Sequence, residues 1–237
     1  MSTISLETPV GQLVAERPAR SRIFEQLGID YCCGGRKPLG EVCQAKGLDP
    51  NAVLGDLEGA EALIAGVDTD WTKASLTDLS NHIETTHHAY VRESLPRLTA
   101  LIEKVSRAHG ANDARLGELR DLFVAFRADF EAHLAKEELI LFPLCRQMDG
   151  APARPEIHCG SVTNPIHVMV SEHDDAGECL LKFRELTDDF TPPQGACNTY
   201  RAMLQALEEL EADTHQHVHK ENNILFPKAV AAENALS

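Results

Sequence analysis

Apolar residues recur at helical spacing along most of the chain, and no segment of useful length alternates as a half-buried β-strand does. Two segments carry the clearest stripes, with members three or four residues apart. The stripe of residues 113–148 contains Leu119, Phe123, Phe126, Phe130, His133, Glu137, Ile140 and Leu144, and that of the last segment contains Met203, Leu207, Leu210, Thr214, His217, Glu221 and Ile224. The pattern predicts an all-α protein.

Breaker residues divide these helices into two regions. Four long helical patterns cover about 75–109, 113–148, 161–189 and from about 193 onward, with short Gly- and Pro-rich connections between them. Residues 1–70 instead contain short helical segments interrupted by glycine and proline. We therefore expect a small helical N-terminal domain at 1–66, followed by an up-down-up-down four-helix bundle at 67–237.

Two similar stretches place polar side chains inside the apolar stripes. They read "HLAKEELILFP" at 133–143 and "HVHKENNILFP" at 217–227, and each puts a glutamate four residues after a histidine. A single such pair is usually a surface pair or a satisfied core histidine. A carboxylate in a bundle seam is unfavourable unless it is paired, and the duplication favours a cation between the helices. The Phe-Pro dipeptides are interpreted as a packing aromatic residue followed by a helix kink.

The other two helices offer further histidines. His173 is the ligand-capable member of the third stripe, whereas the first helix offers the neighbours His87 and His88. His88 is in phase with the longer downstream stripe from Val91, and His87 continues the upstream phase through Ile83, so phase favours His88. At about 1.5 Å rise per residue, all six candidates fall roughly 15–20 Å from one end of the bundle.

This donor set suggests a particular kind of metal centre. Four imidazoles and two carboxylates, without thiolate, suit iron or manganese and would also take zinc. Glu137 and Glu221 can each bridge two metals, which leaves two histidines for each metal. A dinuclear site with an oxo or hydroxo bridge would keep one open position on each metal, at which O₂ or NO could bind.

The N-terminal region contains a second notable motif, "LGIDYCCGGRKPL" at 27–39. Cys32 and Cys33 precede two glycines, which allow a tight turn with positive φ. Adjacent thiols can bind a soft metal, accept a transferred group or pass through a mixed disulfide, but they can also be small turn residues without a role. Three other cysteines lie outside the ligand register and are expected to be free thiols: Cys145, Cys179 and Cys197.

Composition excludes several classes of partner. The net charge of −15 argues against nucleic acid and against an anionic membrane surface. No stretch approaches the roughly 18 apolar residues that a membrane span needs, and the N-terminus lacks the pattern of a signal peptide. Seven cysteines without regular spacing indicate reduced thiols rather than a disulfide framework. We therefore expect a cytoplasmic protein with no nucleic acid or membrane as partner.

The motifs together resemble the bacterial iron–sulfur cluster repair di-iron proteins, the "repair of iron centres" family. The resemblance rests on "DYCCGG", "HHAYVRESLP", "HLAKEELILFP", "SEHDDAGE" and "HVHKENNILFP", and it covers nearly the whole chain. It implies an N-terminal Cys-Cys domain and a hemerythrin-like bundle that binds a non-haem di-iron centre. The implied ligands are the six derived above from phase and height: His88, His133, Glu137, His173, His217 and Glu221.

The resemblance also implies further roles. Cys32 and Cys33 would belong to the N-terminal motif that approaches the bundle. Asp129 and Glu172 resemble family positions near the metal and would relay protons, although solvated helix faces explain them equally simply. The connection at 149–167 is longer than is usual in the family. Its His158 and Cys159 are interpreted either as an ordinary insertion or as a capping loop or accessory metal site.

Three functions from different classes remain open. The first is the repair of iron–sulfur clusters damaged by nitrosative or oxidative stress, with iron–sulfur proteins as targets and iron supplied by the bundle. The second is an enzyme, a di-iron nitric oxide reductase. The third is a carrier or sensor of O₂ or NO, against which the N-terminal thiols count. A homodimer is also left open.

Overall fold

The computed structural model describes residues 4–63, 69–156 and 160–236. These residues form helices joined by loops, with one isolated bridge between Pro9 and Pro38, so the all-α prediction is confirmed for the part of the chain that is described. They divide into two compact units. The first comprises residues 1–79, 148–154 and 215–237, and the second comprises residues 80–147 and 155–214. The predicted domain boundary at 66/67, and also His158 and Cys159, lie outside the described residues.

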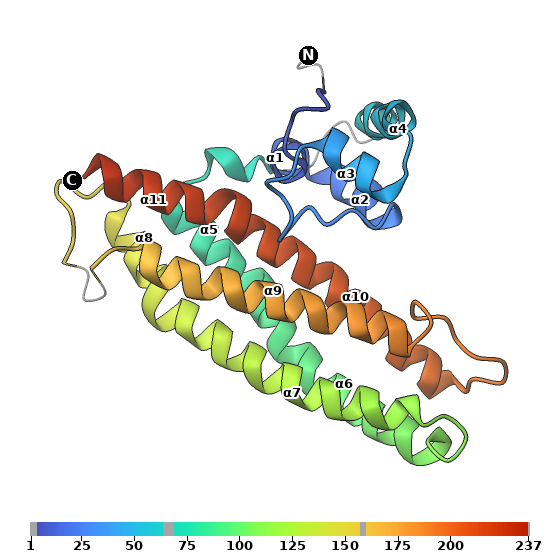
Figure 1. Ribbon diagram of the computed structural model, residues 1–237. Coiled ribbons are helices and arrows are strands. Elements are labelled where there is room, and N and C mark those ends of the chain that lie inside the picture. The colour runs from blue at the N-terminus through green and yellow to red at the C-terminus, as the bar shows by residue number, and fades with distance from the viewer. Residues whose placement is uncertain (1–3, 64–68, 157–159, 237) are drawn as a thin grey trace. The chain divides into compact units, whose positions relative to one another are not determined.

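Four long helices build the second unit, as Figure 1 shows. They are α6 (Ala89–His109), α7 (Arg115–Lys136), α9 (Thr163–Leu186) and residues 198–214 of α10 (Asn198–Lys220). Short connections make neighbouring helices antiparallel, as predicted. Their apolar stripes meet in one core, in which Leu95, Phe123 and Leu207 are at most 1% exposed. Aromatic rings fill its centre, with Phe126 edge-on to Phe183 at 5.4 Å.

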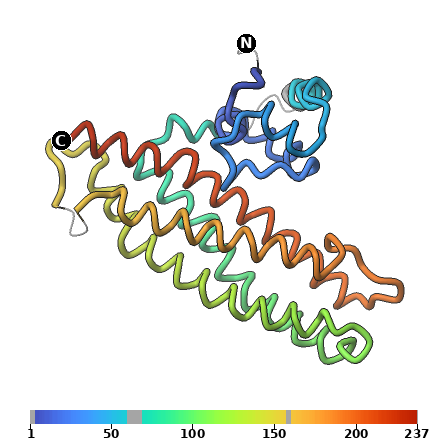
Figure 2. The backbone as a smooth tube through the Cα atoms, in the orientation of Figure 1, coloured from blue at the N-terminus to red at the C-terminus, as the bar shows by residue number. Residues whose placement is uncertain are grey.

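Three π-helical segments each join two consecutive α-helices without a break in the chain. These are η3 (Glu84–His88) between α5 (Leu76–Ile83) and α6, η4 (Glu137–Leu141) between α7 and α8 (Phe142–Met148), and η5 (Glu221–Leu225) between α10 and α11 (Phe226–Ala235). The backbone continues from one element into the next, as the tube in Figure 2 shows. A π-turn holds one extra residue, so the helix face that points inward shifts by one position after it.

This shift corrects one part of the predicted stripe. Ile140 was expected in the core but is 49% exposed, and Leu144 is only half-buried. Leu141, Cys145 and Met148 are buried instead, because the wide turn at η4 advances the inward face by one residue. Straight α-helical phase could not have predicted this.

The first unit contains the short N-terminal helices. They are α1 (Val10–Glu16), the 3₁₀ turn η1 (Pro18–Arg20), α2 (Ser21–Gln26), α3 (Leu39–Lys46) and α4 (Pro50–Leu63), and a second 3₁₀ turn, η2 (Trp71–Lys73), follows. Their core includes Leu13, Phe24 and Tyr31 together with Val218 from the end of α10. Arg20 is buried and donates to the Leu13 carbonyl at 3.0 Å, which satisfies part of its guanidinium.

None of the described helices is both long enough and apolar enough to cross a membrane.

Candidate metal centre

The six histidines and glutamates singled out in the sequence are all buried. None is more than 3% exposed, and both carboxylates are fully inaccessible. His88 ends η3, Glu137 begins η4 and Glu221 begins η5, so three of the six occupy π-helical segments. The other three lie in regular helix, with His133 in α7, His173 in α9 and His217 in α10.

These side chains form two overlapping groups, each with two histidines and two glutamates. One group contains His88 and His217, and the other contains His133 and His173. Glu137 and Glu221 belong to both groups. Within each group, one ligand atom from each residue lies within 4.8 Å of the others. The arrangement offers room for two cations that share both carboxylates.

The spacing of the donor atoms tests whether a metal fits. His88 Nε2 lies 3.3 Å from Glu137 Oε2, and His217 Nε2 lies 3.1 Å from Glu221 Oε1. His133 Nε2 lies 3.4 Å from Glu137 Oε1 and 3.1 Å from His173 Nε2. Donors held about 2.1 Å from one cation at angles of roughly 90–110° are about 3.0–3.4 Å apart. The residues therefore fit a transition-metal ion in both spacing and chemistry.

Two outer carboxylates orient two of the imidazoles. Glu138 Oε1 lies 2.7 Å from His88 Nδ1, and Glu172 Oε2 lies 2.9 Å from His133 Nδ1. Each of these carboxylates also accepts from a cation, Arg92 for Glu138 at 2.6 Å and Lys136 for Glu172. Such second contacts fix the ring orientation of metal-binding histidines.

The ionisation of these carboxylates decides which ring nitrogen carries the proton. Burial alone would raise the pKa of Glu138, but Arg92 and His88 outweigh it and lower the pKa below its usual value. Lys136 and His133 do the same for Glu172 against its own burial. An ionised carboxylate only accepts hydrogen bonds, so the Nδ1–H of each imidazole donates to it. Nε2 of each ring then carries the lone pair, with which it could bind a cation next to Glu137.

Aromatic rings hold the same two imidazoles. The His88 ring stacks on Phe142 at 5.3 Å between centroids, and the His133 ring lies parallel to Phe130 at 5.8 Å. Phe142 is therefore the packing aromatic that the Phe-Pro motif predicted, and Pro143 follows it in the first turn of α8, where a missing N–H is tolerated.

The structure separates the remaining candidates. His87 is absent from both groups, and its Nδ1 contacts Asp213 Oδ1 at 2.8 Å. Glu172 contacts His133, whereas Asp129 is exposed on α7.

Sequence reasoning missed Glu138, the partner of His88. The "EE" at 137–138 was its only signal, because a residue next to a ligand reads as an ordinary surface position.

The five-residue step between the buried residues Ile83 and His88 could have predicted the π-helical segment η3 from the sequence. Upstream and downstream stripes of the first helix differ in phase at this point, and η3 accounts for the difference. The phase break thus marked a π-turn, which is frequently found at functional sites.

The Cys-Cys turn of the N-terminal region is organised by Asp30. Its Oδ1 accepts from the backbone N–H groups of Cys32 and Cys33 at 3.0 and 2.9 Å, and its Oδ2 accepts from Gly34 at 2.8 Å. Cys32 Sγ lies 3.2 Å from Asp30 Oδ1 and 3.9 Å from Cys33 Sγ. The neighbouring thiol, burial and Asp30 together raise the pKa of Cys32 well above its usual value.

The segment η5 reaches this turn through two asparagines. Asn223 Nδ2 donates to the carbonyls of Tyr31 and Cys32 at 3.2 and 3.1 Å, and Asn222 Nδ2 donates to Cys32 at 3.4 Å. Gly35 permits this approach, since a Cβ there would lie 2.4 Å from Asn223 Oδ1 and 2.6 Å from the Tyr31 carbonyl oxygen. The thiol turn is therefore fixed by the residues that directly follow Glu221.

Two known families match the chain. Residues 79–229 match the family described as Hemerythrin HHE cation binding domain, and residues 6–61 match a domain of unknown function, DUF542, also called ScdA_N. The first match includes all six buried histidines and glutamates, and the second includes the Cys-Cys turn.

Curated relatives cover almost the whole chain. One from Enterobacter sp. (strain 638) is 37% identical over 227 residues, which is 96% of this chain and 98% of the relative. Relatives from Citrobacter koseri and Escherichia coli O157:H7 are each 36% identical with the same coverage. All three carry the name "Iron-sulfur cluster repair protein YtfE".

Proposed function

The chain belongs to the family of iron–sulfur cluster repair proteins that carry a hemerythrin HHE cation binding domain, and we propose from this premise that it repairs clusters by supplying iron. The repair acts on iron–sulfur proteins damaged by nitrosative or oxidative stress. The iron is held as two non-haem ions with an oxo or hydroxo bridge. The ligands are His88, His133, Glu137, His173, His217 and Glu221.

One observation carries this proposal. Two buried groups of donors share Glu137 and Glu221, and each group adds two imidazoles of its own. Because both carboxylates are fully inaccessible, their negative charge needs compensation inside the protein. Two cations would provide it. Nitrogen and hard oxygen donors without sulfur are compatible with iron.

The chain's own residues prepare the donors. Glu138 and Glu172 hold the Nδ1–H protons of His88 and His133, so that Nε2 of each ring faces Glu137. The rings of Phe130 and Phe142 cover these imidazoles with apolar surface and exclude water from them. When bound, the metal pair would supply redox chemistry and open positions for NO or O₂.

The same geometry favours nitric oxide reduction as a second candidate function. Two cations that share two carboxylates would lie next to each other, which suits the coupling of two NO molecules. The third candidate function is that of a carrier or sensor, which would bind NO without reducing it. Product analysis for nitrous oxide after anaerobic addition of NO separates the second from the third.

Other parts of the proposal concern organisation and location. We propose that residues 1–66 and 67–237 are separate domains, that Cys32 and Cys33 take part in iron or NO chemistry, and that Asp129 and Glu172 relay protons. The described cysteines form no disulfide with one another, and we propose a cytoplasmic location. A homodimer would be detected by sedimentation of the purified protein.

Repair of a damaged cluster tests the function directly. An iron–sulfur hydratase inactivated with NO is mixed with the iron-loaded protein, and recovery of its activity is followed without added iron. We expect recovery with the unmodified protein and little with Glu137→Ala or Glu221→Ala, each of which removes a shared carboxylate.

His167→Ala is the matched control, because His167 is an exposed histidine on the same helix as His173. It should repair as well as the unmodified protein. Recovery that is equally fast with both glutamate variants would contradict iron supply from this centre.

A further inference from the structure

The thiol turn of the first unit brings three potential ligands together outside the buried His and Glu groups. One ligand atom each from Asp30, Cys32 and Cys33 lies within 4.8 Å of the others. We propose that these residues form a second cation site, for a thiophilic divalent ion such as Fe(II) or Zn(II). The site gives the role proposed above for Cys32 and Cys33 a chemical form, and it would exist whether or not the bundle binds iron.

The distance between the thiols suits a cation better than a disulfide. The two Sγ atoms are 3.9 Å apart, nearly twice the ~2.05 Å of a disulfide bond. Two thiolates about 2.3 Å from one tetrahedral ion lie about 3.8 Å apart. Adjacent residues also have Cα atoms only ~3.8 Å apart, below the usual range for disulfides of about 4.4–6.8 Å.

Asp30 is placed to complete the site. Its Oδ1 lies 3.2 Å from Cys32 Sγ, close to the roughly 3.5 Å expected for an oxygen and a sulfur on one tetrahedral ion. In the cation-free form the thiol hydrogen of Cys32 points to this oxygen. On binding, both thiols would lose their protons to solvent, and the ion would take the position of that hydrogen. The charge of the ion offsets the repulsion among three anionic groups.

The turn is rigid enough to hold these ligands in place. Asp30 accepts three backbone N–H groups within it, and Asn223 and Asn222 hold the Cys32 carbonyl from outside. Preorganisation of this kind distinguishes a binding site from a chance meeting of side chains.

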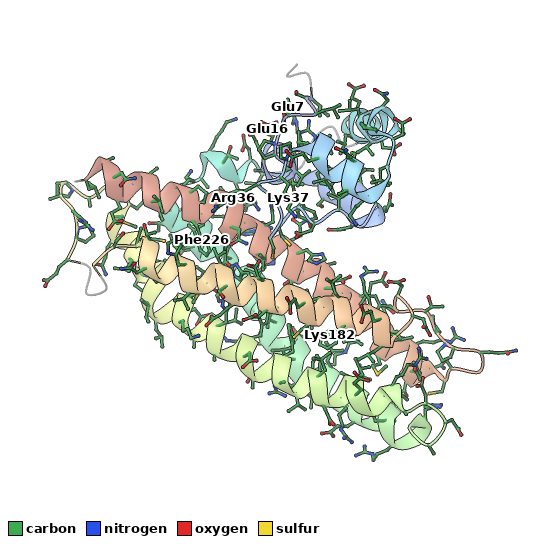
Figure 3. All side chains as sticks on the ribbon, in the orientation of Figure 1. Glu7, Glu16, Arg36, Lys37, Lys182 and Phe226 are labelled. Carbon is green, nitrogen blue, oxygen red and sulfur yellow. The ribbon has the colours of Figure 1, made fainter. Side chains whose placement is uncertain are left out.

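One side of the site faces solvent. Cys32 is buried, but Cys33 is partly exposed and Asp30 is exposed. Three protein ligands leave a tetrahedral ion with one open position, at which a thiolate of another molecule could bind. Arg36 and Lys37, which are labelled in Figure 3, follow the turn in the sequence, and both are exposed. Their positive charge would favour the approach of such an anionic ligand.

Cobalt titration of the full-length, iron-loaded protein tests the site. Co(II) is added anaerobically, and difference absorption is used to detect the sulfur-to-cobalt charge-transfer band, which a site of nitrogen and oxygen ligands cannot produce. We expect one such band, saturating at one cobalt per chain.

Variants identify the ligands. Cys32→Ser combined with Cys33→Ser should abolish the band, while Asp30→Asn should keep it and weaken binding by at least about 10-fold. Cys43→Ser is the control, because Cys43 is a buried thiol of the same unit outside the group, and it should change nothing. Helical circular dichroism and iron content show whether the double variant is folded.

Two results would overturn the proposal. One is the absence of a sulfur band in the unmodified protein, and the other is an undiminished band in a folded double variant. Neither result bears on iron in the bundle, which is measured separately, so the two proposals fail independently.

Discussion

At the scale of single residues, two outer carboxylates support two of the predicted ligands. Glu138 and Glu172 each connect an imidazole to a cation on the protein surface, Arg92 and Lys136. A carboxylate on Nδ1 raises the basicity of the ring and fixes its orientation. These contacts therefore extend the candidate centre outward from the buried donors.

Replacing Glu138 by Gln should weaken cation binding while leaving the fold intact. The neutral amide no longer stabilises the charge that develops on His88, and we expect iron affinity to fall about 10- to 100-fold. Competition with a chelator measures the affinity. Glu131→Gln is the control and should leave the iron affinity unaltered. Glu131 is an exposed residue of α7 that pairs with Arg127 instead of a histidine. Equal affinities for the two variants would argue against the role of Glu138.

Cys197 should react faster than Cys179 near neutral pH. Hydrogen bonds from the Tyr200 backbone and from His109 lower its pKa to about 7, whereas burial raises the pKa of Cys179 above its usual value. Because only the thiolate is alkylated, the Cys197 rate should rise with pH through about 7 and then level off. Peptide mapping after iodoacetamide treatment compares the two sites in one sample. A faster reaction at Cys179 would contradict the assignment.

At the scale of elements, π-helical segments set the geometry of the candidate centre. Each of the three includes one of the buried donors, His88, Glu137 or Glu221, at one of its ends. The extra residue in each segment turns that side chain relative to the helix that follows. The helices can then continue with their own apolar faces inward.

Deleting Leu139 tests this role of η4. Its side chain is 78% exposed, and removing one residue allows α-helical hydrogen bonds to replace the wide turn without changing the phase of α8. We expect the protein to keep its helicity but to lose much of its iron affinity, as Glu137 is re-aimed. Leu139→Ala is the control and should bind normally. Full binding by the deletion variant would show that the π-turn is dispensable.

The contact between η5 and the thiol turn should be sensitive to a single methyl group. Gly35→Ala brings a Cβ within 2.6 Å of the Tyr31 carbonyl oxygen, which cannot move aside as a flexible side chain would. We expect a loss of roughly 1–3 kcal/mol in the free energy of unfolding. Gly55→Ala, in α4 with no atom within 4 Å of the new Cβ, should instead stabilise by about 0.5–1 kcal/mol. Urea denaturation distinguishes these outcomes, and equal stabilities would contradict the close packing.

At the scale of the whole molecule, the helical class and the buried donors could be predicted because both follow from the helical spacing of apolar residues along the chain. A histidine and a glutamate inside an apolar stripe are recognisable without coordinates, and the repeat at 133–143 and 217–227 made them stand out. The π-turns escaped prediction, because a single inserted residue changes the phase only locally. Ile140 was misplaced for this reason.

Contacts between distant segments were also beyond reach from the sequence. The hydrogen bonds from Asn222 and Asn223 to the thiol turn join residues about 190 positions apart, and nothing in "ENNILFP" indicates their target. The partners of His88 and His133 depend likewise on how neighbouring helices are rotated. Helical spacing predicts which face of a helix a residue lies on, but it does not identify the residues of other helices that pack against that face.

Iron content of the purified, reconstituted protein tests the central claim most directly. The unmodified chain and His167→Ala should each bind two irons, while Glu137→Ala and Glu221→Ala should each bind one or none, because each glutamate belongs to both groups of donors. Two irons retained in both glutamate variants would contradict a shared, carboxylate-bridged centre.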